Sequence, residues 1–249
     1  MIRKKLLFFM SLTAMTAIFT GCLNSGGNRA SYSYYAVMVY NPEIMDLTMN
    51  APEPLLVPEL QGKVKEGDCM RASYTIDFDN QPTGSLYYTA TNVSIYPLNK
   101  RTLRIEGGDM IDDHNDSINN IRQIFGEIYF DGKIFVIADQ QGNANQLYKL
   151  EAICNPDSVD ENGIHTVYLK SKKDNETSGD SKTSVSTEEA IDMNPMLAAY
   201  GKDSIYSLNK EVIFRYVNFN LKYQSGTVDG APVYRSYGNS PITVLSLKK

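Results

Sequence analysis

The residues best suited to metal binding gather in one acidic segment. Asp112, Asp113, His114 and Asp116 fall within the stretch GGDMIDDHNDS, residues 107–117. Closely spaced oxygen ligands of this kind can hold a divalent cation such as Ca²⁺. The segment lacks the central Gly and the distal Glu of an EF-hand loop, and runs of charge usually face solvent. The favoured interpretation is therefore an exposed loop between domains, with the four residues kept as alternative metal ligands. No cofactor is predicted.

Catalytic side chains do not form a familiar motif. The chain has two histidines, and His165, the second, falls in a stretch with the pattern of a strand. Neither Gly-x-Ser-x-Gly nor His-Glu-x-x-His occurs, so no nucleophile–base pair is indicated. The sequence predicts that the protein is not an enzyme. A hydrolase whose site assembles only on folding is the least favoured alternative.

The first cysteine, Cys22, has the setting of a lipid anchor. Three basic residues, 3–5, precede the uncharged stretch 6–19. A helix of this length spans about 21 Å, less than the ~30 Å hydrocarbon core of a bilayer, so residues 1–21 are predicted to be a signal peptide. The sequence Phe-Thr-Gly-Cys that ends this segment resembles the lipobox of bacterial lipoproteins. The resemblance implies a diacylglyceryl group on the Cys22 thiol and cleavage before it.

Small polar residues follow Cys22, and residues 22–31 are predicted to be a flexible tether. Position 23 is Leu rather than the Asp that resembles an inner-membrane retention signal. No acidic run resembling a surface-export signal follows it. The favoured location is therefore the outer membrane, on its periplasmic face, with surface exposure as the alternative.

The charge of the mature chain argues against nucleic-acid binding. Removal of residues 1–21 lowers the number of basic residues from 24 to 21 against 29 acidic ones, a net charge of −8. Binding to a nucleic-acid backbone requires clustered Lys and Arg. The predicted partners are the membrane, through the lipid anchor, and a protein, peptide or glycan.

Two further cysteines, Cys69 and Cys154, leave two alternatives open. In an oxidising compartment they could form a disulfide across a long loop, which would stabilise the fold by about 4–5 kcal/mol in the chain-entropy model. They could equally be two separate thiols, because pairing cannot be deduced from sequence.

The remainder of the sequence predicts an all-β protein. Its 17 tyrosines and frequent Val, Ile and Thr suit pleated sheets. Residues 70–78 alternate between apolar and polar side chains and are predicted to pair with 88–96. Asp131-Gly132 predicts a hairpin between 126–130 and 133–137. Further strands are expected at 32–40, 146–152, 165–172, 210–216 and 241–247.

Polar residues separate two of these strands. Residues 173–186 contain few apolar side chains and are predicted to be an exposed loop. Thr187 has the pattern of a helix N-cap, so a short helical turn is expected there, with Pro195 limiting its length.

The stretch GDCMRASYTIDFDNQPTGSLYYTATNVSIY, residues 67–96, resembles the OB-like domain of the NigD-like lipoproteins of Bacteroidetes. Residues 116–137 and 214–222 resemble later landmarks of that family. The resemblance implies a small OB-like barrel over residues 32–105, followed by a larger β-sandwich over 106–249. It also implies a role in bacteriocin immunity.

Besides the hydrolase alternative, two binding functions follow from these observations. The favoured one is a non-catalytic binding module of the envelope that captures a protein or peptide. A glycan-binding accessory lipoprotein is the alternative, because OB-like barrels bind several classes of ligand. Five tyrosines could form a stacking surface for sugars: Tyr32, Tyr34, Tyr35, Tyr87 and Tyr88. Packing of alternate tyrosines against the two faces of a sheet is the favoured interpretation of their spacing.

Three serines follow an aspartate and precede an aliphatic residue: Ser117, Ser158 and Ser204. Asp-Ser-aliphatic resembles the O-glycosylation acceptor motif of Bacteroidetes envelope proteins. A modified serine would have to lie on an exposed segment.

Overall fold

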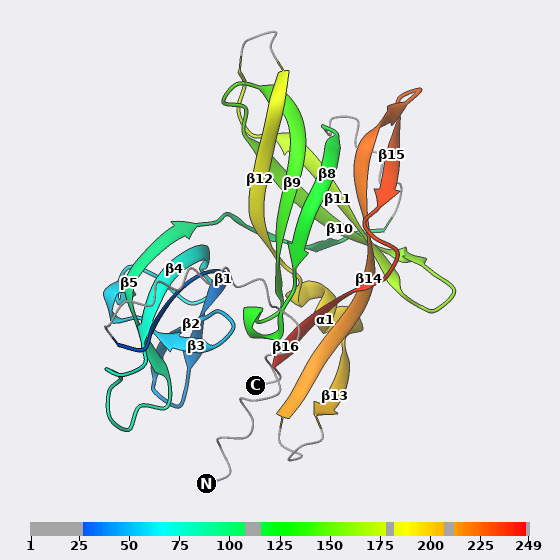
Figure 1. Cartoon of the computed structure of the whole chain (residues 1–249). Helices are drawn as coiled ribbons and strands as arrows, with labels where there is room; N and C mark the ends of the chain where they lie inside the picture. The colour runs from blue at the N-terminus through cyan, green and yellow to red at the C-terminus, as the bar shows by residue number, and fades with distance from the viewer. Residues whose placement is uncertain (1–26, 108–115, 178–181, 207–211, 248–249) are drawn as a thin grey trace.

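Two β domains make up the fold, a barrel and a sandwich (Figure 1). The computed structural model describes residues 27–107, 116–177, 182–206 and 212–247. Within these residues the only α-helix is α1 (Asn194–Tyr200), which has seven residues. The predicted fold class, all-β with a small barrel followed by a larger sandwich, is confirmed. No helix in the described ranges is long and apolar enough to cross a membrane.

The barrel is closed by five strands in the order β1-β2-β3-β5-β4. Their bounds are β1 (Arg29–Asn41), β2 (Asp46–Asn50), β3 (Pro54–Leu56), β4 (Cys69–Asp77) and β5 (Tyr88–Pro97), with the short 3-10 helix η2 (Pro58–Leu60) after β3. β4 alternates buried and more exposed side chains, and Ala72, Tyr74 and Ile76 point into the barrel core. β4 pairs with β5 in antiparallel fashion, so the predicted pairing of 70–78 with 88–96 is confirmed.

The sandwich consists of two sheets. The four-stranded sheet has the order β6-β12-β9-β8, and the seven-stranded sheet has the order β13-β14-β11-β10-β7, with β15 and β16 also paired to β14. The bounds are β6 (Lys100–Thr102), β7 (Arg104–Ile105), β8 (Ile118–Phe125), β9 (Lys133–Asn143), β10 (Tyr148–Val159), β11 (His165–Lys173), β12 (Lys182–Asp192), β13 (Lys202–Tyr206), β14 (Val212–Val228), β15 (Ala231–Ser236) and β16 (Ile242–Leu247).

Apolar side chains of both sheets meet in one core. Val136 and Ile191, from the four-stranded sheet, belong to the same buried cluster as Leu169 and Phe219 from the seven-stranded sheet. Burial of such side chains stabilises each by about 1.5–3 kcal/mol relative to exposure, so this layer is the main stabilising element of the sandwich.

The barrel begins earlier and ends earlier than the range 32–105 expected from the sequence. β1 starts at Arg29, inside the expected tether, and pairs there with Asp77 of β4. At the other end, β6 pairs in parallel with β12, and β7 pairs in parallel with β10. Residues 100–105 therefore contribute to the sandwich, because their hydrogen-bond partners lie on its sheets.

The expected hairpin around Asp131-Gly132 is only partly correct. Both residues have the left-handed conformation of a turn, with φ values of 51° and 76°. Residues 126–130 are not a strand, because Ile128–Phe130 forms the 3-10 helix η3. β9 pairs instead with β8. Gly126 lies where an added Cβ would come within 3.2 Å of Ile134 Cγ2, so the chain passes close to β9 before it leaves the sheet.

Two expectations for the segment between β11 and α1 are wrong. Residues 182–186 are not a loop, because β12 starts at Lys182 and pairs with β9. The turn expected at Thr187 is part of the same strand, where Thr187 and Glu189 are buried. Sheet pairing outweighs the local capping pattern there. The helix begins instead at Asn194, and Pro195 occupies its first turn, where the missing N–H of proline is tolerated.

Candidate functional site

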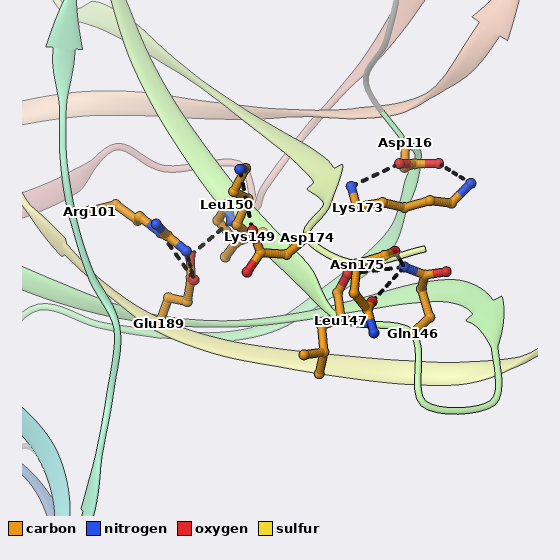
Figure 2. Close-up of polar contacts among 10 residues, drawn as sticks. All are labelled: Arg101, Asp116, Gln146, Leu147, Lys149, Leu150, Lys173, Asp174, Asn175 and Glu189. Atoms are coloured by element: carbon orange, nitrogen blue, oxygen red, sulfur yellow. Dashed lines mark hydrogen bonds and ion pairs between the residues drawn. The ribbon is translucent and has the colours of Figure 1, made fainter. Parts of the chain in front are cut away.

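The predicted metal ligands are only partly described. Three of them lie outside the described residues, namely Asp112, Asp113 and His114. The predicted lipidation site, Cys22, also lies outside them. The carboxylate of Asp116 accepts the backbone N–H of Lys173 at 3.1 Å and lies 3.4 Å from its Nζ (Figure 2). Across the described ranges, no three His, Cys, Asp or Glu side chains are close enough to hold a metal ion. Asp116 therefore fastens its segment to β11.

The loop after β11 is held by a polar network (Figure 2). The side-chain oxygen of Asn175 accepts the backbone N–H of Leu147 at 2.6 Å and a hydrogen bond from Gln146 Nε2 at 2.9 Å. The Asp174 carboxylate lies 3.3 Å from Lys149 Nζ. These contacts pair the side chains of Asp174 and Asn175 locally, so they fix the start of the loop and leave these two side chains few free groups for a ligand.

A second part of the network is buried. Arg101 Nη2 donates to Glu189 Oε1 at 2.8 Å, and Arg101 Nε donates to both carboxylate oxygens. The other oxygen accepts the backbone N–H of Leu150 at 2.8 Å. The pair therefore joins three strands, β6, β12 and β10, as Figure 2 shows. Its role is structural.

The three serines of the Asp-Ser-aliphatic motif differ in accessibility. Ser117 is half-buried before β8, and the Ser158 hydroxyl lies 3.0 Å from the Tyr168 hydroxyl. Ser204, on β13, is exposed. Of the three, Ser204 best meets the exposure that modification requires. O-glycosylation at these serines stays a prediction.

The two described cysteines are free thiols, so the structure does not contain the disulfide alternative. Cys69 packs in the apolar cluster between the domains, whereas Cys154 packs in the sandwich core. Burial raises the pKa of each thiol to about 11. Both are therefore protonated and unreactive at neutral pH.

The five tyrosines considered as a sugar-stacking surface do not form one platform. Tyr87 donates to Glu43 at 2.9 Å, and Tyr88 meets Phe78 edge to face at 5.2 Å. Tyr32 and Tyr34 are stacked, with their ring centroids 6.0 Å apart. Only Tyr34 and Tyr35 line the pocket described next.

A pocket of about 270 Å³ lies between the barrel and the sandwich. We call it the interdomain cleft. Figure 1 shows β1 of the barrel beside the end of the sandwich at which β8 leads into η3. The barrel contributes Ser33, Tyr34 and Tyr35 from β1 and Arg71 from β4, and the sandwich contributes Gln123, Phe125, Glu127, Tyr129 and Phe130. Both domains are therefore needed to form it.

Aromatic rings form a continuous row along the cleft. Tyr35 packs against Phe125 and Phe135, with ring centroids 4.7 Å apart in both pairs. Phe130 meets Phe135 edge to face, and Tyr129 meets Phe130 in the same way, again at 4.7 Å. Such pairs contribute about 0.5–1.5 kcal/mol each beyond the burial of their area, so the row also holds the domains together.

The polar groups of the cleft fall into two sets. Tyr35 donates its hydroxyl hydrogen to Glu188, and Arg71 Nη1 lies 3.5 Å from the same carboxylate. Burial, with help from Glu188, raises the pKa of Tyr35. Glu127 and Gln123 differ, because neither side chain has a hydrogen bond or ion pair to another described residue. Burial raises the pKa of the Glu127 carboxyl.

The domain junction fixes the cleft walls. Val37, Cys69, Phe130 and Phe135 are buried together in one cluster that spans both domains. The ammonium of Lys100 donates to the backbone oxygen of Gly67 at 3.1 Å. Only two residues separate the end of β5 from the start of β6. Separation of the domains would expose the cluster, so the walls have a defined spacing.

Another pocket, of about 200 Å³, opens on the barrel. It is lined by Met38, Asp46, Leu47, Leu56, Val57, Pro58, Leu60, Gln61, Gly62 and Val64. Most of these side chains are aliphatic and none is aromatic. The interdomain cleft combines rings with donors and acceptors, which is the composition typical of small-molecule sites.

Comparison with known proteins supports the assignment of the barrel. Residues 26–94 match the family described as a lipoprotein OB domain. The resemblance of residues 67–96 to a lipoprotein OB domain is therefore confirmed. Residues 26–94 are therefore similar to a lipoprotein OB domain, in agreement with the closed barrel of β1 to β5. A search of curated proteins found no match.

Solved structures with similar folds come from Parabacteroides and Bacteroides. An uncharacterized protein from Parabacteroides merdae is 17% identical, with a TM-score of 0.59 over 87% of this chain and 98% of that one. A protein of unknown function from Bacteroides vulgatus is 13% identical, with a TM-score of 0.51 over 84% and 91%. A NigD-like immunity protein from Bacteroides caccae is 10% identical, with a TM-score of 0.44 over 85% and 94%. The first two support the two-domain fold.

The sequence did not single out Gln123, Glu127 or Tyr129 as site residues. Glu127 and Tyr129 lie in residues 126–130, the first strand of the expected hairpin, and Gln123 lies just before it. The only local signal is the density of aromatic residues, with Phe125, Tyr129, Phe130 and Phe135 within 11 positions.

Proposed function

We propose that this protein is a non-catalytic lipoprotein of the cell envelope that binds a ligand in the interdomain cleft. Acyl chains on Cys22 would anchor it to the outer membrane, on its periplasmic face, because a lipoprotein cysteine with two or more chains is held far more firmly than one with a single chain. The short segment before Arg29 would separate the barrel from the lipid surface. The ligand would be a protein, a peptide or a glycan.

One observation carries this proposal, the composition of the interdomain cleft. Half-buried aromatic rings line it together with Gln123 and Glu127, whose polar groups are not used by the fold. Gln123 is exposed and Glu127 is half-buried, so both polar groups are accessible from the cleft. A ligand that enters the cleft could bond to them without breaking a contact of the fold.

The same lining residues support a non-catalytic role. They include one carboxylate, Glu127, and neither a histidine nor a cysteine. Acid–base hydrolysis commonly uses two groups with different protonation states. His165 does not line the cleft; its ring is tilted against that of Tyr200 on the sandwich, with centroids 3.9 Å apart.

Lipid anchoring is tested by metabolic labelling with a clickable palmitate analogue. The wild-type protein and the control Cys69→Ala should be labelled and enter the detergent phase, whereas Cys22→Ala should be unlabelled. Equal labelling of Cys22→Ala and the wild type would refute the anchor.

Binding at the cleft is tested by site-specific photocrosslinking in intact cells. A photoreactive amino acid at Gln123 should give an adduct with the bound ligand, whether protein or polysaccharide. The control position is Glu161, which is exposed in the turn between β10 and β11. The proposal fails if position 123 gives no adduct, or only the adducts that position 161 also gives.

A further inference from the structure

We infer that the interdomain cleft binds one neutral sugar unit of an oligosaccharide, held between its aromatic rings and the side chains of Gln123 and Glu127. This inference rests on the proposed function, in which the cleft is the ligand site, and it names the chemical class of the ligand.

The aromatic lining suits the apolar face of a sugar ring. Tyr34, Phe125 and Tyr129 line the cleft and are each half-buried, so part of each ring remains accessible. The face of an aromatic ring carries partial negative charge and attracts partially positive C–H groups. A pyranose presents several C–H groups on one face and directs its hydroxyls outward, toward the polar parts of the walls.

The polar lining suits the hydroxyls of a sugar. The Gln123 amide has both donor and acceptor capacity, and the Glu127 carboxylate offers two acceptor oxygens. Both groups are planar, so each can bond two neighbouring hydroxyls at once. Gln123 is exposed on β8, and Glu127 is half-buried just before η3, so the two belong to the same wall of the cleft.

The charges of the cleft argue against an anionic ligand. The cleft lining has one cation, Arg71, and one anion, Glu127. Arg71 is paired with Glu188, whereas Glu127 would repel an anionic ligand. Burial raises the pKa of Glu127, so its charged form is disfavoured in the empty cleft. Hydroxyl donors stabilise that form without adding a second charge.

The size of the cleft limits the ligand to a small unit. Its volume of about 270 Å³ lies just below the range of about 300–1,000 Å³ typical of small-molecule sites. One ring would fill such a space, and the rest of an oligosaccharide would extend outside it. A basic peptide that places a Lys or Arg side chain beside Glu127 is the competing ligand that the experiment must distinguish.

The test is calorimetry of the full mature chain with two sets of probes, at 50 and 500 mM NaCl. The first set is a panel of neutral tri- to hexasaccharides of hexoses and N-acetylhexosamines. The second is a panel of Lys- and Arg-rich peptides. We expect at least one oligosaccharide to bind with a Kd that changes less than about twofold with salt, because a neutral ligand has no ionic attraction to screen.

Variants locate the binding. Gln123→Ala and Glu127→Ala should each weaken binding of that oligosaccharide about tenfold or more, which corresponds to about 1.4 kcal/mol. The controls Glu161→Gln and Tyr40→Ala change exposed side chains that do not line the cleft, and should bind like the wild type. Circular dichroism must show that each variant is folded. Glu127→Gln provides a second test of position 127, because it keeps the planar shape.

Three results would overturn the inference. They are the absence of any oligosaccharide binding, unchanged binding in the Gln123 and Glu127 variants, and binding only of basic peptides with strong dependence on salt. In the last case the cleft would still be a ligand site, so the proposed function would stand. It would fall only if the photoreactive group at position 123 also gave no specific adduct.

Discussion

Arg101→Met should destabilise the sandwich strongly, because it leaves the Glu189 carboxylate buried without its cation. The Glu189 side chain is 2% exposed, and its oxygens receive three contacts from Arg101 and one from the backbone N–H of Leu150. After the substitution the Leu150 N–H is the one donor to these oxygens that remains among the described residues. Met preserves most of the length and packing of the Arg stem, so the effect isolates the loss of charge and hydrogen bonds.

The magnitude follows from the burial of the pair. Removal of one partner of a buried ion pair typically costs about 3–5 kcal/mol. The Arg101 side chain is 32% exposed, so solvent already screens part of its interaction. We therefore expect a loss of about 2–3 kcal/mol in the free energy of unfolding of the sandwich. For a domain of this size this corresponds to a decrease of about 4–12 °C in Tm.

Urea denaturation followed by circular dichroism measures this loss, and two further variants test its cause. Arg104→Met removes a cation three residues away that is 49% exposed and pairs with Glu106 and Glu151. As a surface pair it should change stability by about 1 kcal/mol or less. Arg101→Met combined with Glu189→Gln should recover part of the loss, because the Gln carbonyl still accepts the Leu150 N–H and no charge is buried.

The reasoning is refuted if Arg101→Met is within about 0.5 kcal/mol of the wild type, which would place it in the range of ordinary surface substitutions. It is also refuted if the double variant is less stable than Arg101→Met. That result would mean that the uncompensated charge of Glu189 is not the source of the loss.

Three other predictions concern the buried thiols and a turn glycine. Cys69 and Cys154 should resist alkylation at pH 8 in the native protein and both react in denaturant without a reductant; a native disulfide would block the second reaction. Burial raises the pKa of both thiols to about 11, above that of an unfolded thiol. The free energy of unfolding should therefore fall as pH rises from about 9 to 11. A rise in stability over this range would contradict the prediction. Gly132→Ala should destabilise the protein by more than about 2 kcal/mol, because φ is +76° and the new Cβ would lie 2.5 Å from Asn194 Oδ1. Gly163→Ala, with a similar φ but open surroundings, should cost about 1 kcal/mol, and an equal effect at both glycines would exclude a role for the close contact.

Local patterns predicted the strands whose two faces differ. In β4 the alternation of buried and exposed side chains is visible in the sequence because one face packs in the barrel core and the other does not. β6 could not be predicted in this way. It has three residues, and its partner β12 lies about 90 positions further along the chain, so its pairing depends on tertiary structure. The barrel was expected to extend to residue 105 because this pairing with the sandwich cannot be read from the sequence.

The interdomain cleft could not be predicted from the sequence for a related reason. Its lining comes from three short segments of two domains, and no segment alone has the spacing of a binding motif. The acidic residues around Asp116 were considered as metal ligands because they are close in sequence. Glu127 is a single carboxylate in an aromatic stretch, and it becomes notable only through its partial burial and its lack of a partner among the described side chains.

Tyr35 links the architecture of the junction to its function. It belongs to the barrel, yet its ring stacks on Phe135 of the sandwich and its hydroxyl donates to Glu188. The same side chain therefore fastens the domains and forms part of the cleft wall. A cleft whose walls are already fixed loses little conformational freedom when a ligand enters, and its backbone should move little. Because Tyr35 and Arg71 are engaged by Glu188, selection of the proposed ligand would fall to polar lining groups that the junction does not use, Gln123 and Glu127 among them.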